Sequence, residues 1–164
     1  MLEQNIRITT KWDYYAPDAL DKDCEIINWL AEYQVKYGNG IDANGLVWGN
    51  HRIVGSWPHE SIYAHDRGKL IGGALFSDND DWIYLDRAFI LPEYRGQGIY
   101  SAIVKKIDEC AEQHNIRGIE VHTWDFEAPN IYEHLGFTRG CVFPDKPKRN
   151  TEYHYFKLYE STGK

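Results

Sequence analysis

The sequence predicts an α/β fold of the α+β kind, in which helices pack on a mixed sheet within a single domain over residues 1–164. Three observations predict it. Several short segments alternate apolar and polar residues, as strands do, and longer segments repeat apolar residues at helical spacing. A glycine-rich turn joins one of these strands to one of these helices. No repeat or linker divides the chain, and 164 residues suffice to bury one core.

The order of these elements is the basis of the predicted architecture. Alternation and turn residues predict strands at residues 5–12, 62–65, 69–76, 82–90, 118–123, 137–143 and 152–159. Helical spacing predicts helices over residues 18–38, 99–112 and 128–135. Turns at residues 66–68 and 77–81 make three of the strands consecutive and antiparallel. Residues 38–60 are rich in Gly and Asn and form either a surface loop or a substrate-binding loop.

The composition argues against several classes of function. The formal net charge is −7, and basic residues cluster only at Lys146, Lys148 and Arg149, so no nucleic-acid partner is expected. No apolar run reaches the length of a membrane span, and the N-terminus lacks the apolar core of a signal peptide. We therefore expect a cytoplasmic protein without membrane contact. The three widely spaced cysteines agree with a reducing compartment, and the acidic balance favours cationic substrates such as amines.

The glycine-rich segment Arg95-Gly96-Gln97-Gly98-Ile99-Tyr100-Ser101 has three interpretations. Glycines suit a tight strand-to-helix turn whatever the ligand. The segment also approximates the dinucleotide fingerprint G-x-G-x-x-G, with Glu120 where a ribose-binding acid belongs, but the third glycine is missing and too little sequence follows for a doubly wound sheet. In the third interpretation, the backbone N–H groups of residues 96–101 and the helix dipole hold the pyrophosphate of coenzyme A. Arg95 then anchors the loop or pairs with a phosphate.

Two motifs in this order resemble the GNAT superfamily of N-acetyltransferases. The stretch I-L-P-E-Y-R-G-Q-G-I-Y-S matches its Gln/Arg-x-x-Gly-x-Gly/Ala signature at Arg95 and Gly98, with Tyr100 in place of the usual small residue. Residues 125–137, D-F-E-A-P-N-I-Y-E-H-L-G-F, are similar to its N-x-x-A-x-x-x-Y-E-x-x-G-F, with Asp125 in place of Asn. The chain looks most like small bacterial members of undefined substrate. The resemblance implies a central, mostly antiparallel sheet with splayed strands, flanked by helices, and acetyl-CoA as co-substrate.

The resemblance also implies roles for particular residues. The strands at residues 82–91 and 118–123 would splay apart, and the backbone of Ile90 and Leu91 would hold the pantetheine arm in the gap. Tyr132 aligns with the tyrosine that commonly protonates the departing thiolate. A phenol suits this task because it is a proton donor that remains neutral at pH 7.

Asp86 is the first candidate for the general base that removes a proton from the amine. It lies in the region where many relatives place a carboxylate facing the substrate. Strand alternation puts Asp86 on the same face as Tyr84 and Ile90. The alternative role for Asp86 is an ion pair with Arg87 or another neighbour.

His122 and Glu120, on the next predicted strand, are the other candidates for the base. A histidine is suitable because its pKa ordinarily lies near neutrality. No HExxH or other metal-ligand spacing occurs among the seven histidines, so no metal is expected.

Together these features predict an acyl-CoA-dependent N-acyltransferase. It would move an acetyl group from acetyl-CoA to a primary amine of a small molecule or peptide, by direct attack in a ternary complex. The alternative is a non-catalytic acyl-CoA-binding or regulatory module on the same fold. A homodimer is possible, with the C-terminal strands as its contact.

Overall fold

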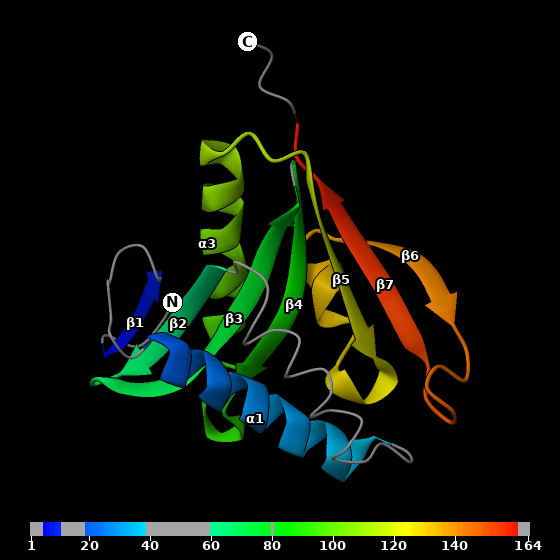
Figure 1. Ribbon diagram of the computed structural model, residues 1–164, viewed down its shortest axis with the longest axis horizontal. Coiled ribbons are helices and arrows are strands. Elements are labelled where there is room, and N and C mark those ends of the chain that lie inside the picture. Colours follow the sequence, from blue (N-terminus) through cyan, green and yellow to red (C-terminus); the bar gives the residue numbers. More distant parts are fainter. Residues whose placement is uncertain (1–4, 11–18, 39–59, 80, 161–164) are drawn as a thin grey trace.

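The described part of the chain forms one seven-stranded sheet with helices on both faces (Figure 1). The computed structural model describes residues 5–10, 19–38, 60–79 and 81–160. The strands are β1 (Ile6–Thr10), β2 (Glu60–Asp66), β3 (Lys69–Asn79), β4 (Trp82–Ile90), β5 (Gly118–Trp124), β6 (Thr138–Phe143) and β7 (Glu152–Leu158). The helices are α1 (Ala19–Tyr37), α3 (Ile99–Gln113) and α4 (Ile131–His134), with the 3-10 turns η1 (Pro92–Tyr94) and η2 (Asp125–Glu127). The predicted fold class is confirmed.

The strand order is β1-β2-β3-β4-β5-β7-β6. Each neighbouring pair is antiparallel except β4 and β5, which run parallel. That exception follows from the chain path, because α3 carries the chain back across the sheet between these two strands and such a crossover produces a parallel pair. The sheet is therefore mostly antiparallel, as expected.

Two apolar clusters hold the helices against opposite faces of the sheet. On one face, Ile103, Val104 and Ile107 of α3 pack on residues of the central strands. On the other face, Ile26 and Ile27 of α1 pack on a smaller cluster of strand residues. Both helices owe their position to these apolar stripes, because burying apolar surface is the main favourable term in folding.

A β-bulge interrupts β4 at Asp86. Leu75 of β3 pairs with Arg87 and the next residue, Phe76, pairs with Leu85, so Asp86 is an extra residue on its strand. A bulge bends its strand and increases the local twist. The pairing of β4 with β5 ends at this same point, because its last pair joins Leu85 to Val121. Beyond it the C-terminal ends of β4 and β5 diverge (Figure 1), which is the splay that the resemblance implies.

The bulge also corrects the predicted alternation along β4. Before it, Ile83 and Leu85 belong to the cluster on the α3 face. After it, Ile90 belongs to that same cluster, whereas Phe89 packs on α1. Tyr84 and Ile90 therefore lie on opposite faces, and the expectation of a common face was wrong because one inserted residue inverts every side chain that follows.

Several sequence-based expectations are not tested by the fold. Residues 39–59 lie outside the described residues, so the role of the 38–60 segment stays open, as does the start of the first helix at Asp18. β6 is an edge strand that exposes Val142 and Phe143, and the dimer contact on the C-terminal strands stays a prediction. Within the described ranges, none of the helices combines the length and apolar character needed to cross a membrane.

Gly73 of β3 allows α1 to lie close to the sheet, and its replacement tests this packing. A Cβ at Gly73 would stand 2.5 Å from Cδ1 of Ile26 and 2.6 Å from the backbone oxygen of Ile62. We expect Gly73→Ala to lower the free energy of unfolding by about 1–3 kcal/mol, as overpacked cores do. Urea unfolding followed by circular dichroism measures this change.

Gly140→Ala in β6 is the matched control. A Cβ there would meet its nearest neighbour, the oxygen of His154, at 3.4 Å, so the expected change is within about 0.5 kcal/mol. An unfolding midpoint of Gly73→Ala equal to that of the control would contradict this account of the packing.

Candidate active site

The divergence of β4 and β5 opens a cleft of about 630 Å³ that passes through the sheet. Its walls are β4 from Tyr84 to Ile90, the glycine loop with the first turn of α3, β5 from Val121 to Trp124 and the segment that leads to α4. Leu30, Tyr33 and Gln34 of α1 and Glu152 of β7 complete them. The volume falls within the usual range for small-molecule sites, about 300–1,000 Å³. Because both faces of the sheet contribute to the lining, two ligands have room to meet in it from opposite sides.

The glycine loop lies at one end of this cleft and has the geometry of an anion cradle. Gly96 and Gly98 take positive φ angles of 76° and 79°, and Gly98 is the N-cap of α3. A Cβ at either glycine would meet no atom within 4 Å, so the conformation rather than crowding requires glycine there. The first bond of the helix runs from Ala102 N to Gly98 O, which leaves the preceding N–H groups without helical acceptors. Such groups bind phosphate oxygens.

Arg95 anchors the loop. Its Nε donates to the carbonyl oxygen of Ile90 at 2.9 Å. Its guanidinium carbon lies 4.9 Å from the ring centroid of Tyr33 and 5.0 Å from that of Phe89, so the cation packs against both aromatic rings, which also contact each other. Of the two roles expected for Arg95, the structure shows the anchoring one.

Most of the residues that the sequence nominates for cofactor binding line the cleft, but two do not. The cleft brings together Ile90, Arg95, Gly96, Gly98, Ile99, Tyr100 and Ser101. Leu91 and Gln97 are not among the lining residues. The N–H of Leu91 donates to Ile71 O at 2.9 Å, and its carbonyl accepts from Tyr94 N at 2.9 Å. Leu91 therefore closes the end of β4 instead of facing the cleft.

Tyr132 is buried at the α3 side of the cleft, 7% exposed. Its ring lies 5.5 Å from that of Phe137 and 5.3 Å from that of Tyr155, which fixes its position. Its hydroxyl is 3.0 Å from the hydroxyl of Tyr100. Burial, followed by the neighbouring Tyr100, raises the pKa of Tyr132 well above its ordinary value of 10.0. The phenol is therefore a proton donor throughout the physiological range.

Asp86 lines the cleft from the bulge in β4. Its Oδ1 lies 3.0 Å from Nη1 of Arg87, and the two side chains are 22% and 26% exposed. Nη1 of Arg87 also donates to the backbone oxygen of Asp86 at 2.9 Å, so the guanidinium is clamped on this residue. Asp86 thus combines both expected features, a carboxylate in the cleft and an ion pair with Arg87.

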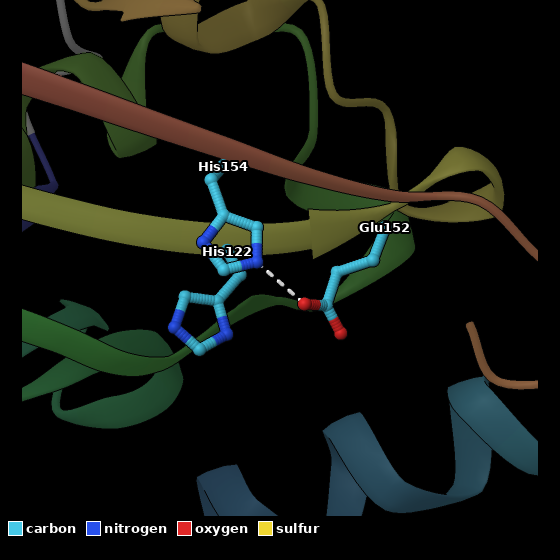
Figure 2. Close-up of side chains that lie close together, drawn as sticks. All are labelled: His122, Glu152 and His154. Carbon is cyan, nitrogen blue, oxygen red and sulfur yellow. Dashed lines mark hydrogen bonds and ion pairs between the residues drawn. The ribbon is translucent and has the colours of Figure 1, made fainter. Parts of the chain in front are cut away.

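A second group of polar side chains lies on the α1 face of β5 and β7 (Figure 2). The strand register places His122 directly opposite His154, and their rings stack with centroids 4.3 Å apart and an angle of 10°. Nε2 of His154 lies 2.5 Å from Oε1 of Glu152. On the other side, the hydroxyl of Tyr84 is 2.9 Å from Nε2 of His122. His122, Glu152 and Tyr84 line the cleft, whereas Glu120 does not.

The charges in this group depend on one another. Partial burial, together with the adjacent His154, lowers the pKa of His122, so its ring is mostly neutral at pH 7. Burial alone would raise the pKa of Glu152, but hydrogen bonds from His154 and Lys146 outweigh it and hold the pKa below its ordinary value. Burial and the nearby charge of Asp86 raise the pKa of Tyr84. Glu152 is therefore ionised at neutral pH, and its Oε1 pairs with Nζ of Lys146 at 2.9 Å.

The turn after β5 joins the cleft to α1. Oε2 of Glu127 accepts from Thr123 Oγ1 at 3.0 Å and from Trp124 N at 3.1 Å, which fixes η2. Oε1 of Glu127 accepts from Nε2 of Gln34 on α1 at 2.6 Å. Asp125, where the superfamily motif has Asn, accepts from the backbone N–H of Thr151 at 3.2 Å. The second motif, residues 125–137, therefore supplies the hydrogen-bonded turn η2 as well as Tyr132.

Sequence reasoning missed the side chains that only strand pairing brings to the cleft. Glu152 and His154 lie two residues apart, so alternation places them on one face of β7, but nothing in the sequence pairs that face with His122. It missed the phenol of Tyr100 as well, because only the backbone of that residue was considered.

Known proteins resemble this chain in sequence. A family model described as an acetyltransferase (GNAT) domain matches residues 58–139. The chain is 30% identical to blasticidin-S acetyltransferase of Streptomyces morookaense over 89 residues, which are 54% of this chain and 65% of that protein. It is 38% identical to thialysine N-epsilon-acetyltransferase of Mus musculus over 56 residues, 33% of each chain. It thus spans between a third and two thirds of the length of these relatives.

Solved structures resemble it in fold. The ribosomal-protein-S18-alanine N-acetyltransferase of Escherichia coli superposes with a TM-score of 0.68 at 14% identity, covering 97% of both chains. An acetyltransferase structure from Salmonella typhimurium with its cofactor acetyl-CoA gives 0.64 at 15% identity, covering 98% of both. These identities support the fold alone. The family model, however, covers half of the chain and includes both the glycine loop and Tyr132, and the chain therefore belongs to the GNAT acetyltransferase family.

Proposed function

We propose that this protein is an N-acetyltransferase that moves an acetyl group from acetyl-CoA to a primary amine by direct attack in a ternary complex. The observation that carries the proposal is the cleft through the splayed sheet. It places an anion cradle at one end and joins it to a buried phenol on the α3 face and to carboxylates on the α1 face. Family membership supports the same reaction.

The residues at the glycine loop fit coenzyme A. Gly96 and Gly98 take positive φ angles, and the N–H groups before Ala102 have no acceptor within the helix, which suits a pyrophosphate. The stretch of β4 beyond Leu85 has no pairing with β5, so its backbone edge faces the cleft. An extended amide-bearing arm can lie along such an edge as an added strand does.

The chain's own groups supply the two proton transfers of the reaction. As the amine nitrogen bonds to the carbonyl carbon and the carbon–sulfur bond breaks, the thiolate needs one proton and the amine must lose one. We propose that Tyr132 donates the first and that Asp86 accepts the second, directly or through one water. His122 is the alternative base, because it lines the same cleft and its ring is mostly neutral at pH 7. Glu120, outside the lining, is the weaker alternative.

The acceptor proposed here is a cationic small molecule or peptide amine. Glu152 and Asp86 line the cleft with carboxylates that now pair with Lys146 and Arg87, and a substrate ammonium group can take the place of such a cation. The net charge of −7 adds a long-range attraction for cations. Among the relatives, the name thialysine N-epsilon-acetyltransferase also specifies a side-chain amine as the acceptor.

Tyr132→Phe tests the proposed proton donor. We expect kcat for acetyl transfer to fall roughly 100-fold, the lower end of what general acid catalysis contributes, with little change in the binding of acetyl-CoA. A turnover screen across polyamines, aminoglycosides, amino acids and peptides, read by thiol release, first supplies the acceptor. Tyr159→Phe is the matched control, because its hydroxyl bonds Asp108 outside the cleft lining. Wild-type kcat in Tyr132→Phe would remove Tyr132 from the mechanism.

Asp86→Asn tests the proposed base. Loss of the carboxylate should lower kcat by roughly 100-fold at neutral pH, in metal-free buffer. Asp81→Asn is the control, since Asp81 pairs with Arg117 before the start of β4 and does not line the cleft.

If His122→Gln abolishes turnover while Asp86→Asn retains it, the base is His122. If the wild-type protein binds coenzyme A but acetylates nothing in the screen, the non-catalytic acyl-CoA-binding module replaces the enzyme.

The raised pKa of Tyr132 predicts the alkaline side of the pH profile. A general acid works in its protonated form, so activity is lost as the pH rises through the pKa of that acid in the complex. Because burial raises the pKa of Tyr132 above 10.0, kcat at saturating substrates should show no falling limb between pH 7 and pH 10. Stopped-time assays over this range, with thermal melts at each pH as a folding control, measure it. A falling limb centred below pH 10 would contradict the assignment.

A further inference from the structure

We propose that His122, His154 and Glu152 form a binding site for one divalent transition-metal ion of the zinc class, at the α1 side of the cleft. Each residue offers one ligand atom, and the three atoms lie within 4.8 Å of one another. Figure 2 shows the two imidazoles one above the other, with the carboxylate beside them. The binding site itself does not depend on the proposed acetyl transfer.

The distances are close to those that such an ion requires. Zinc binds imidazole nitrogen and carboxylate oxygen at about 2.0–2.2 Å, so tetrahedral ligand atoms stand roughly 3.4 Å apart. One pair, His154 Nε2 and Glu152 Oε1, is already within hydrogen-bond distance at 2.5 Å. The imidazole lone pairs lie in the ring planes, so the two rings, now stacked with an angle of 10°, would have to turn out of this parallel arrangement to bind one ion.

The ligand set selects the class of metal. Two imidazoles and one carboxylate suit zinc, cobalt and nickel, whereas calcium and magnesium prefer oxygen ligands throughout. Three protein ligands leave a fourth position open. Since His122 and Glu152 line the cleft, that open position faces the cleft.

The strands and their neighbours hold the ligands in place. His122 and His154 are directly opposite in the antiparallel pairing of β5 with β7, so their separation is set by the sheet. The hydroxyl of Tyr84 contacts the ring of His122 at 2.9 Å, and partners of this kind orient imidazole ligands. Glu152 is buried, so its carboxylate is not spread over many rotamers.

In the present arrangement the ammonium group of Lys146 supplies the positive charge beside Glu152 that a bound metal ion would supply. Nζ of Lys146 lies 2.9 Å from Oε1 of Glu152 and 4.5 Å from the ring centroid of Phe143, and its side chain is 54% exposed. A metal ion that binds Glu152 must displace this ammonium. Lys146 therefore acts as a competitor, and its removal should strengthen binding of the ion.

Binding of the ion would have a consequence for the proposed reaction. The ion would stand where the amine enters, between Glu152 and the rest of the cleft, and would block the acceptor without touching the glycine loop. Zinc should then inhibit in competition with the amine and not with acetyl-CoA. This consequence rests on the proposed function, whereas binding of the ion is measured without any substrate.

The experiment titrates cobalt(II) into the purified full chain after treatment with EDTA. Four-coordinate cobalt absorbs strongly in the visible range, whereas hydrated cobalt does so weakly. We expect an intense band that saturates at one equivalent, is removed by zinc and is unaffected by magnesium. His122→Gln, His154→Gln and Glu152→Gln should each weaken binding by at least about 10-fold. His114→Gln and His134→Gln, on other elements, are the matched controls and should bind as the wild type does.

Lys146→Met gives a test that does not depend on losing a ligand. Removing a partly exposed ion-pair partner should tighten binding by roughly two- to fivefold, the range that such pairs contribute. Thermal melts in EDTA check that each variant is folded. Absence of the band in the wild type, or equal binding by Lys146→Met and by the ligand variants, would overturn the site, as would displacement of cobalt by magnesium.

The two proposals fail in different ways. If cobalt binds as described while no amine is acetylated, the site stands and the proposed function fails. If acetyl transfer proceeds and zinc neither binds nor competes with the amine, the enzyme stands and the metal site fails. If both proposals hold, His154→Gln should still transfer acetyl groups, because His154 does not line the cleft. Zinc should no longer inhibit this variant, because the variant lacks one ligand of the ion.

Discussion

The end of the pairing between β4 and β5 is the constraint on which the site depends. Two parallel strands that continued side by side would fill the sheet and leave no cleft. Here the last pair joins Leu85 to Val121, and the extra residue Asp86 bends β4 at that point. One inserted residue therefore opens the cleft, frees the edge of β4 for a ligand and places a carboxylate at the point of divergence.

An opened sheet needs other contacts to hold its two sides, and α1 supplies several of them. Tyr33 lies against the guanidinium of Arg95, and its hydroxyl donates to the backbone oxygen of Phe126 at 3.1 Å. Gln34 on the next position bonds Glu127 in the turn after β5. The C-terminal half of α1 thus connects the glycine loop on one side of the cleft with η2 on the other. A change in α1 would therefore reach both binding regions.

The two faces of the sheet divide the chemistry of the site. Tyr132 belongs to the buried cluster on the α3 face, where the low dielectric keeps its phenol protonated. His122, His154 and Glu152 lie on the α1 face, where partial exposure allows charge. A reaction that must donate one proton and accept another is served by such a separation, since each group keeps the protonation state that its surroundings favour. The same exposure makes the α1 face open to ions.

Much of this could be predicted from local sequence. The positive φ angles of the loop need glycines, the helix that follows needs its apolar stripe, and both are legible as patterns at short range. The order of the elements was likewise predictable, since each strand and helix leaves its own period. The candidate role of Tyr132 came from a motif of consecutive residues, which fold locally into η2 and α4.

Other features depend on contacts between residues far apart in the chain. The bulge at Asp86 is defined by its pairing with β3, so alternation alone placed Tyr84 and Ile90 on one face when they lie on two. The register of β5 with β7 brings His122 to His154, and no spacing in the sequence specifies that register. The sequence by itself determined the fold class and the glycine turn, because these follow from local periodicity and backbone conformation, and Tyr132 was singled out by the resemblance of a consecutive motif. The tertiary structure alone decided the shape of the cleft, the loop-anchoring place of Arg95 and the cluster of two histidines and a glutamate, because pairing between strands sets these positions.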